Sequence, residues 1–530
     1  MRSARRLALL LALPACAYMG AAARQSALAE RQAAQPSLGT LKHLLETATC
    51  YVYGRVLDPD DRGAGRAVAV AAFANAYGAM ELVDVMHGAG IGTHYGLNLP
   101  HVPGTAYRLL VLADADGNGQ YDDGEILGQR VIAADATGAD QVLGNVDILL
   151  TGAADAHLPA PVPMPPRREV RKSLFYPGGT IRELDDPIFA PEVATLGVYE
   201  PAAFTEKAPT MFYALEEDIG FKIPVVFVHG IGGSPREFAA LLQRLDRRRF
   251  KPWFFYYPSG ADLAQIAALL HRILFSGDAV AQDPMVPVIL VAHSMGGVVV
   301  REALNLLDDA AAAHDDIHFV SIASPLGGHP SAAAGTRYGP LVVPSWRSLD
   351  PGGEFIAGLY RRPLPPFVHY RLVYAYRADG VVHFGENGDG VVPLSSQLRQ
   401  EAQAEAASQR GFDATHTGIL EDDHALAFVA DGIHAVHTRY PEDHEQWFQQ
   451  GGFVFDGECA QGPIPKLMIE TIGLYVQALV LGRIQPVTDY QRHFLEAVRG
   501  GAPPTDPFAA AWLDFVARHP NPVPKRGDAK

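Results

Sequence analysis

The hydrophobic pattern changes character along the chain. Between residues 48 and 150, short apolar runs such as CYVYGRVL and AYRLLVLAD are separated by clusters of Gly, Asp and Pro, and little of this stretch shows a helical period. Such runs are typical of strands, so we expect a small β-sandwich of Ig-like or transthyretin-like type. Residues 151–172 are rich in proline and are predicted to form an extended linker.

From residue 173 to 440, strand-like and helix-like runs alternate, which predicts a mostly parallel sheet covered by helices on both faces. Residues 193–201 and 210–217 are predicted as leading strands. Residues 234–247, with Ser234 as cap, and 263–274 are predicted as helices. Residues 441–530 are predicted as a helical extension with helices at 466–481 and 507–518. The core strands are expected at residues 223–228, 252–258, 287–292, 317–323 and 370–376.

One serine stands at the apex of a predicted strand-turn-helix unit. The sequence VILVAHSMGGVVV places Ser294 directly after a strand rich in Val and Ile, with Gly296 and Gly297 behind it. Small neighbours allow the tight turn of a nucleophile elbow, which holds a serine oxygen clear of its own backbone. Two positions earlier the usual glycine is replaced by Ala292. The alternative is an ordinary Gly-containing turn in an α/β protein.

A second Gly-rich turn, VHGIGGS, follows the strand at residues 223–228. Glycines at such a turn let backbone N–H groups approach a ligand. We therefore expect the N–H of Ile231 and that of Met295 to form an oxyanion hole beside Ser294. The alternative is a phosphate-binding loop or a plain turn, but the G-K-S/T of a phosphate loop is absent from the sequence.

Five motifs in this order, VHGIGGSP, YYPSG, VAHSMGG, SPLGGH and NGDGVVPLSSQ, resemble the bacterial α/β-hydrolase family of lipase-like serine esterases, which is related to bacterial triacylglycerol lipases. The resemblance covers roughly residues 173–430 and implies an α/β-hydrolase fold with a Ser-Asp-His triad. The matching positions are Ser294, Asp389 and His416. His416 would take the serine proton and return it to the leaving group, while Asp389 would orient the imidazole.

Four histidines near the end of this region compete for the role of base. His416 lies in a loop of small residues, ATHTG, ahead of an apolar segment, whereas His424 stands among carboxylates at the start of a predicted helix, and His434 and His437 come later in the same stretch. A general base must reach both the serine and the aspartate, which favours the loop position. Residues 324–366 are irregular and are predicted to form a cap with Trp346 and Phe355 as wall residues, a surface excursion being the alternative.

The amino-terminal region contains an acidic loop, DADGNGQYDDGE. Its spacing matches an EF-hand calcium loop, although the runs on either side are strand-like instead of helical. A structural calcium ion and a solvated acidic turn are both compatible with this pattern. The candidate ligands are Asp114, Asp116, Asn118, Gln120, Asp122 and Glu125.

The pattern of residues 1–23 predicts an export signal. Arginines come first, an apolar run from Leu7 to Leu13 follows, and small residues come last. The segment Leu13-Pro14-Ala15-Cys16 resembles a lipobox, which would make Cys16 a lipidated amino terminus of an outer-membrane or cell-surface lipoprotein. Cleavage after Ala23 would instead give a soluble periplasmic or secreted protein. In an oxidising compartment Cys50 and Cys459 could pair, and two separate thiols are the alternative.

The chain of 530 residues has a formal charge of −16 and its Lys and Arg residues are scattered, so nucleic acid is not an expected partner. We predict an exported carboxylic-ester hydrolase that acts on ester or lipid substrates without a catalytic cofactor and contacts the membrane through its lipid anchor. An amidase or acyltransferase with the same triad is one alternative. A surface-binding protein on a non-catalytic hydrolase scaffold is another.

Overall fold

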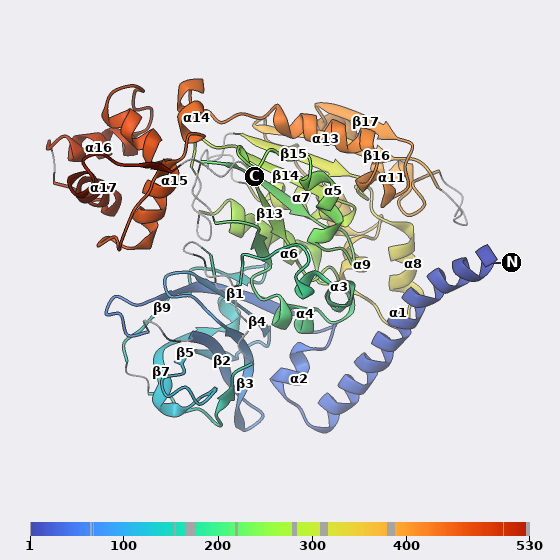
Figure 1. Cartoon of the computed structure of the whole chain (residues 1–530). Helices are drawn as coiled ribbons and strands as arrows, with labels where there is room; N and C mark the ends of the chain where they lie inside the picture. Colours follow the sequence, from blue (N-terminus) through green and yellow to red (C-terminus); the bar gives the residue numbers. More distant parts are fainter. Residues whose placement is uncertain are drawn as a thin grey trace.

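The computed structural model describes residues 2–63, 66, 68–152, 155–165, 173, 176, 177, 179–217, 221–277, 283–307, 316–378, 387–501 and 503–525, with side chains from residue 17 onward. A central sheet of seven strands lies in the middle of the molecule (Figure 1). Its order is β11-β13-β12-β14-β15-β16-β17, with β11 antiparallel to β13 and every other pair parallel. The strands are β11 (Phe212–Ala214), β12 (Ile223–Val228), β13 (Phe250–Phe255), β14 (Val288–His293), β15 (Ile317–Ile322), β16 (Val368–Ala375) and β17 (Ser408–Phe412).

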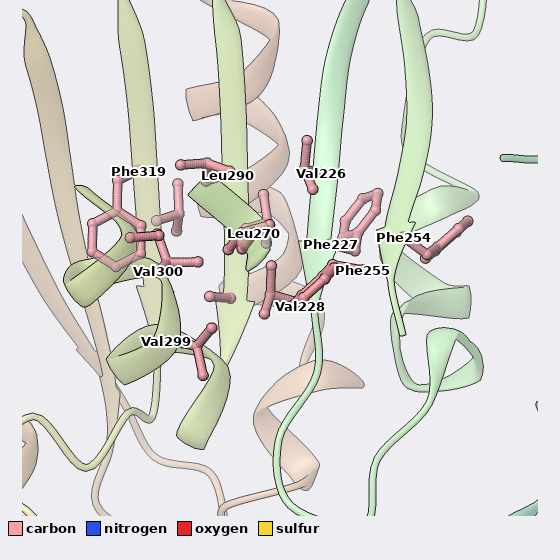
Figure 2. Packing of buried hydrophobic residues seen from close by; sticks show 14 of the residues in the cluster. Val226, Phe227, Val228, Phe254, Phe255, Leu270, Leu290, Val299, Val300 and Phe319 are labelled. Atoms are coloured by element: carbon pink, nitrogen blue, oxygen red, sulfur yellow. The ribbon is translucent and has the colours of Figure 1, made fainter. Parts of the chain in front are cut away.

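Both faces of this sheet are buried. Side chains alternate between the faces along a strand, so in β12 Phe227 points one way and Val226 and Val228 the other. The ring of Phe227 lies 4.9 Å from that of Phe238 on one face. Figure 2 shows the packing of strand side chains with Leu270 of α6 (Leu263–Leu274) and with residues of α7 (Met295–Asn305). Runs such as IPVVFV, which are apolar at every position, are explained by this double burial.

The predicted core strands and the helix at 263–274 are confirmed, but several local predictions are wrong. Residues 193–201, predicted as a strand, belong to α3 (Pro191–Tyr199) and α4 (Pro201–Lys207). Each helix has proline at its first position, where the missing N–H costs nothing, and α3 buries Ala194 and Val198 one turn apart. Val and Tyr favoured a strand in the sequence, and tertiary packing overrode that preference.

The helix predicted at 234–247 is shorter than expected and begins with a 3₁₀ turn. A 3₁₀ turn, η4 (Pro235–Phe238), leads into α5 (Ala239–Leu242), and the Ser234 side chain makes no capping hydrogen bond. The backbone bonds here span three residues, as from Glu237 N–H to the Ser234 carbonyl at 3.1 Å. Tertiary contacts favour this winding, because Arg236 donates to the carbonyls of residues 184, 185 and 186 from this turn.

Helices also follow the elbow and occupy the segment predicted as an irregular cap. Residues 324–366 include α8 (Pro330–Tyr338), α9 (Pro344–Ser348) and α10 (Glu354–Gly358), the first two with proline at the helix start. Further along, α11 (Leu394–Gln397) and α12 (Gln400–Glu405) precede β17, and η5 (Gly418–Leu420) and α13 (Asp423–His434) follow it. The side chain of Asp422 caps α13 by accepting from two backbone N–H groups.

Two sheets of four strands precede the central sheet in the chain and share one buried cluster of apolar side chains. The order β3-β2-β5-β7 forms one sheet, and β4-β1-β8, with β9 also paired to β1, forms the other. Assignment to an Ig-like or transthyretin-like sandwich stays a prediction. The strands are β1 (Thr49–Leu57), β2 (Val68–Ala76), β3 (Ala79–His87), β4 (His94–Pro100), β5 (Ala106–Ala113), β7 (Ile126–Ala133), β8 (Val142–Leu143) and β9 (Ile148–Leu149).

The proline-rich segment is more than a linker. Residues 166–172 lie outside the described residues, but β10 (Val162–Pro163) pairs with β6 (Gln120–Tyr121), and Ala156 and Val162 are buried. They join a cluster with Ala69, Ala71 and Phe73 of β2, a strand that is apolar on both faces and needs cover on its outer side.

The first helix, α1 (Arg2–Ala34), includes the predicted export signal. The side chain of Cys16 lies outside the described residues. From residue 18 onward α1 contacts the rest of the chain: the Tyr18 hydroxyl donates to the Leu341 carbonyl, its ring lies 5.7 Å from that of Trp346, and Arg24 pairs with Glu200. Within the described part of the chain, no helix is both long enough and apolar enough to cross a membrane.

The last part of the chain has its own apolar cluster. The predicted helices correspond to α15 (Pro463–Val480) and α17 (Pro507–Arg518), and α14 (Glu442–Phe448) and α16 (Asp489–Val498) were not foreseen. The short strands β18 (Gly452–Phe453) and β19 (Pro524–Lys525) also pair. Whether this part is an independent domain stays a prediction.

A buried ion pair joins the two-sheet region to the region of the central sheet. Lys42 of α2 (Leu38–Lys42) lies 3.0 Å from Asp84 of β3 and 2.8 Å from Glu206 of α4. Its ammonium group is buried, and although burial opposes the charged form, the two carboxylates raise the pKa of Lys42. The cation therefore balances negative charge contributed by both regions.

We predict that Lys42→Met lowers the free energy of unfolding by about 2–3 kcal/mol, below the usual value for a fully buried pair because Glu206 is partly exposed. Urea denaturation would measure the change. Arg55→Met is the matched control, since Arg55 pairs with Asp147 at 3.0 Å but is half exposed, and its loss should change stability by about 1 kcal/mol or less. Equal effects of the two substitutions would contradict the bridging role of Lys42.

Candidate active site

Ser294 has the backbone conformation of a nucleophile elbow. It links β14 to α7 with φ 53° and ψ −129°, a left-handed φ that non-glycine residues rarely adopt. Its N–H donates to the carbonyl of Ile322 at 2.8 Å, which ties the turn to the end of β15. The strand, the turn and the helix that the sequence predicted are therefore present, with the serine at the apex.

The small residues around the serine are required by close contacts. A Cβ at Gly296 would lie 2.3 Å from the carbonyl oxygen of Val228, and one at Gly297 would lie 2.1 Å from Ser324 Oγ. A Cβ at Gly230 would lie 2.7 Å from that of Ser294. Each of these distances is shorter than atoms can approach, so the elbow packs this tightly against β12 and β15 only with glycine at these positions.

The structure brings Ser294, His416 and Asp389 together in one row of hydrogen bonds. His416 Nε2 lies 2.9 Å from Ser294 Oγ, and His416 Nδ1 lies 2.7 Å from Asp389 Oδ2. All three residues are less than 9% exposed. In this arrangement the carboxylate orients the Nδ1–H tautomer, which leaves Nε2 free to accept the serine proton.

Asp389 is held by donors on both of its oxygens. Oδ1 accepts from the N–H of Val391 at 2.9 Å and from that of Val392 at 2.7 Å, and Oδ2 accepts from Gln397 Nε2 at 3.1 Å. The Gln397 amide also exchanges hydrogen bonds with both backbone groups of Ala375 in β16. Gln397 therefore positions the carboxylate. Sequence reasoning missed this role, and the signal available was only its place in the motif NGDGVVPLSSQ.

The loop of His416 is fixed by backbone bonds and by a second buried histidine. The His416 N–H donates to the Asp389 carbonyl at 2.9 Å, and His293 Nε2 lies 3.0 Å from the His416 carbonyl. His293 Nδ1 lies 3.2 Å from Glu237 Oε1. The sequence contained His293 within VAHSMGG, but Glu237 is distant in the chain, so only the fold reveals the pair.

The two histidines have pKa values shifted in opposite directions. Burial lowers the pKa of His416 below its ordinary value of 6.5, and Asp389 only partly opposes this. Burial also disfavours the charged form of His293, but the hydrogen bond and charge of Glu237 raise its pKa. The lowered pKa of His416 favours a neutral imidazole beside the serine, as a general base requires.

The predicted oxyanion donors are available. Gly230 packs on Ser294, which places the Ile231 turn beside the elbow. Among the described residues, no hydrogen bond uses the N–H of Ile231. Met295 is the first residue of α7, so its N–H has no acceptor within the helix. Two backbone donors of this kind can stabilise negative charge that develops on a carbonyl oxygen.

The other candidate histidines lie away from this row. His424 is exposed in the first turn of α13. His434 Nε2 accepts from the N–H of Asp246, and His437 lies near Arg249 and Glu445. Trp346, predicted as a wall residue, packs on Tyr18, and Phe355 packs on the central core.

The acidic loop brings together part of its predicted ligand set. The carboxylate oxygens of Asp114, Asp116 and Glu125 lie within 4.8 Å of one another. The Asn118 amide bridges Asp116 and Asp122 at 3.0 Å each, and Gln120 lies in the short strand β6. The flanking elements are the strands β5 and β7, not the helices of an EF-hand, in agreement with the sequence prediction.

The two cysteines do not form a disulfide. Cys50 is buried in the cluster shared by the two amino-terminal sheets, whereas Cys459 contacts the carboxyl-terminal cluster, and both are free thiols. Burial raises the pKa of Cys50 to about 12, so its thiolate form is disfavoured. The pairing alternative is therefore wrong, because the two residues belong to separate cores.

Comparison with known families gives one partial match. A family model described as lecithin:cholesterol acyltransferase matches residues 277–342, which contain the elbow and the start of the cap. The chain resembles lipase-like α/β-hydrolases. The match covers well under half of the chain, and comparison with curated proteins finds no match.

Solved structures that match part of the chain include a lipase from Bacillus licheniformis, with 17% identity, a TM-score of 0.32, and coverage of 42% of this chain and 97% of that one. A metagenomic carboxyl esterase has 17% identity, a TM-score of 0.31, and coverage of 41% and 79%. Lipase B from Aspergillus fumigatus has 16% identity, a TM-score of 0.31, and coverage of 53% and 68%. Similarity at this level says nothing about the substrate of this chain.

We predict that kcat/KM for ester hydrolysis falls as the pH drops through the pKa of His416, because the protonated imidazole cannot accept the serine proton. Burial lowers that pKa, so the midpoint of the acid limb should lie below 6.5. Rates measured with two uncharged esters of different leaving groups would separate enzyme ionisation from substrate effects. A common midpoint above 6.5 would contradict the assignment of a buried neutral base.

Proposed function

We propose that this protein is a serine hydrolase of carboxylic esters. The observation that carries the proposal is the hydrogen-bonded row from Asp389 through His416 to Ser294, built on a strained elbow at the end of a central strand. An ordinary turn does not require a serine with a left-handed φ, or a buried histidine in line with the serine oxygen.

In the proposed reaction, Ser294 Oγ attacks the ester carbonyl while His416 Nε2 takes its proton. The carbonyl oxygen becomes negative and is stabilised by the N–H groups of Ile231 and Met295. The protonated His416 then gives its proton to the alcohol leaving group, which departs and leaves an acyl-serine. Water, deprotonated by the same histidine, attacks the acyl-serine; the bond to Ser294 Oγ breaks, His416 returns the proton to that oxygen, and the acid is released.

Lipid-like substrates fit the surroundings of the site. Ile231 follows the glycine that packs on Ser294, and Val391 donates its N–H to Asp389, yet both side chains are exposed, at 42% and 54%. Apolar side chains exposed beside a reactive serine offer contacts to an acyl chain. The name of the matched family, lecithin:cholesterol acyltransferase, supports the same substrate class.

Acyl transfer is the second candidate, because the family match is to an acyltransferase. The acyl-serine would then be attacked by an alcohol in place of water, and the same residues would serve both reactions. Adding a long-chain alcohol to the ester assay and analysing the products would distinguish them, since transfer gives a new ester and hydrolysis only the free acid.

We predict that Ser294→Ala abolishes labelling by a fluorophosphonate probe and lowers kcat on a panel of esters of graded acyl length by about 10⁶-fold, because the nucleophile is lost. His416→Ala should also lose nearly all turnover. His424→Ala is the matched control: this histidine is exposed on α13, so its loss should leave turnover near wild type. A probe that fails to label the wild-type protein would instead favour a non-catalytic binding role.

We further propose that the chain is exported and anchored through a lipid on Cys16, with soluble release after Ala23 as the alternative. The sequence pattern of residues 1–23 supports this. In a processed lipoprotein, Tyr18 would lie two residues from the anchor and would still contact Leu341 in the cap region.

The acidic loop is proposed as a structural calcium site. Calcium would lie among the carboxylates of Asp114, Asp116 and Glu125, whose repulsion it would relieve. In the described structure Glu125 Oε1 also accepts the N–H of Ala115, so this residue supports the loop with or without an ion.

We predict that calcium chloride added after EDTA treatment raises the Tm of the wild-type protein, since the ion binds only the folded loop. Glu125→Ala should lower the Tm and remove its response to calcium, while ester turnover changes little. Differential scanning fluorimetry measures the Tm. A wild-type Tm that does not respond to calcium would leave only a solvated acidic turn.

A further inference from the structure

A second group of metal-ligating side chains lies where strands of the central sheet begin, at the end of the sheet opposite to Ser294. His318 of β15 and His369 of β16 are direct partners in the strand register, and Asp316 immediately precedes β15. Ser294 follows the other end of β14, where His293 is level with Ile322. His318 is four positions before Ile322 on β15, which corresponds to about 13 Å along the strand.

The three side chains have the spacing of ligands that share one ion. Asp316 Oδ1 lies 2.9 Å from His318 Nε2 and 3.5 Å from His369 Nε2. The three ligand atoms all lie within 4.8 Å of one another. A tetrahedral zinc ion with bonds of about 2.1 Å holds its ligand atoms about 3.4 Å apart, so small side-chain rotations would suffice.

One oxygen of the Asp316 carboxylate is buried without a hydrogen-bond partner. Asp316 Oδ1 is sealed from solvent and has no hydrogen-bond partner among the described residues, although His318 Nε2 lies at 2.9 Å. A buried acceptor of this kind is destabilising unless a cation or a donor reaches it. The positive charge of Arg439 also acts on Asp316, so an ion bound here would compete with it.

We propose that Asp316, His318 and His369 bind a divalent transition-metal ion of the zinc class. Imidazole nitrogens select such ions over calcium and magnesium, which prefer oxygen ligands. The side chains of His318 and His369 are 22% and 54% exposed, so water can supply the remaining ligand. The ion would tie the amino ends of β15 and β16 together and stabilise the sheet without taking part in chemistry at Ser294.

The test uses the untagged full-length chain after chelator treatment and desalting. Calorimetric titration with zinc chloride alone should show a saturable site, and zinc should raise the Tm. His369→Ala should weaken this binding by about tenfold or more and abolish the Tm shift, because one of three protein ligands is lost. His369 is half exposed, so its substitution should leave the fold and ester turnover intact. Asp316→Asn, which keeps the shape but removes the charge, should weaken zinc binding similarly.

Two control variants separate this site from other zinc ligands on the chain. His424→Ala removes an exposed histidine outside the group, and Glu125→Ala disrupts the acidic loop, so both should bind zinc like the wild type. Absence of zinc binding by the wild type would overturn the proposal. Unchanged zinc affinity and Tm shift in His369→Ala would overturn it as well.

Discussion

The strained backbone of Ser294 is the constraint on which the rest of the site depends. A left-handed φ at a serine costs on the order of 1–3 kcal/mol and persists only where surrounding contacts over-determine it. Here β14 lies between β12 and β15, and the Ser294 N–H is bound to the end of β15. The close approach of Gly230 to the Ser294 side chain and of Gly296 to the Val228 backbone leaves the turn no room to relax.

Around this turn, buried polar groups set the properties of the proposed base. His416 contacts the carboxylate of Asp389 through one nitrogen and Ser294 through the other, and His293 contacts its carbonyl. Hydrogen bonds and charge interactions are stronger in surroundings of low polarity than in water, so the carboxylate of Glu237 favours the charged form of His293. Burial favours the neutral form of His416. The pKa values of these two neighbouring histidines are thus shifted in opposite directions, and the one whose pKa is lowered faces the serine.

Specific contacts attach the parts outside the central sheet to it. Lys42 joins the two-sheet region to α4, and Arg272 of α6 reaches Asp140 at 3.0 Å. The proline-rich segment that precedes the central region covers the outer face of β2 through Val162. The proposed metal ligands lie at the amino ends of β15 and β16, whereas Ser294 follows the other end of β14. An ion bound there would stabilise the sheet without taking part in the proposed chemistry at the serine.

Local patterns in the sequence determined the elements whose signals lie within a few residues. The apolar run at 223–228 is β12, the amphipathic stretch at 263–274 is α6, and the motif around Ser294 predicted its elbow. The order of the motifs also indicated Asp389 and His416 as the partners, which the structure places in hydrogen-bond contact. The tertiary structure alone decided that residues 193–201 are helical, that Cys50 and Cys459 occupy separate cores, and that Glu237 reaches His293 and Gln397 holds Asp389. The physical reason is range: periodicity and turn residues act between near neighbours, whereas burial and buried hydrogen bonds depend on which distant segments meet once the sheet has formed.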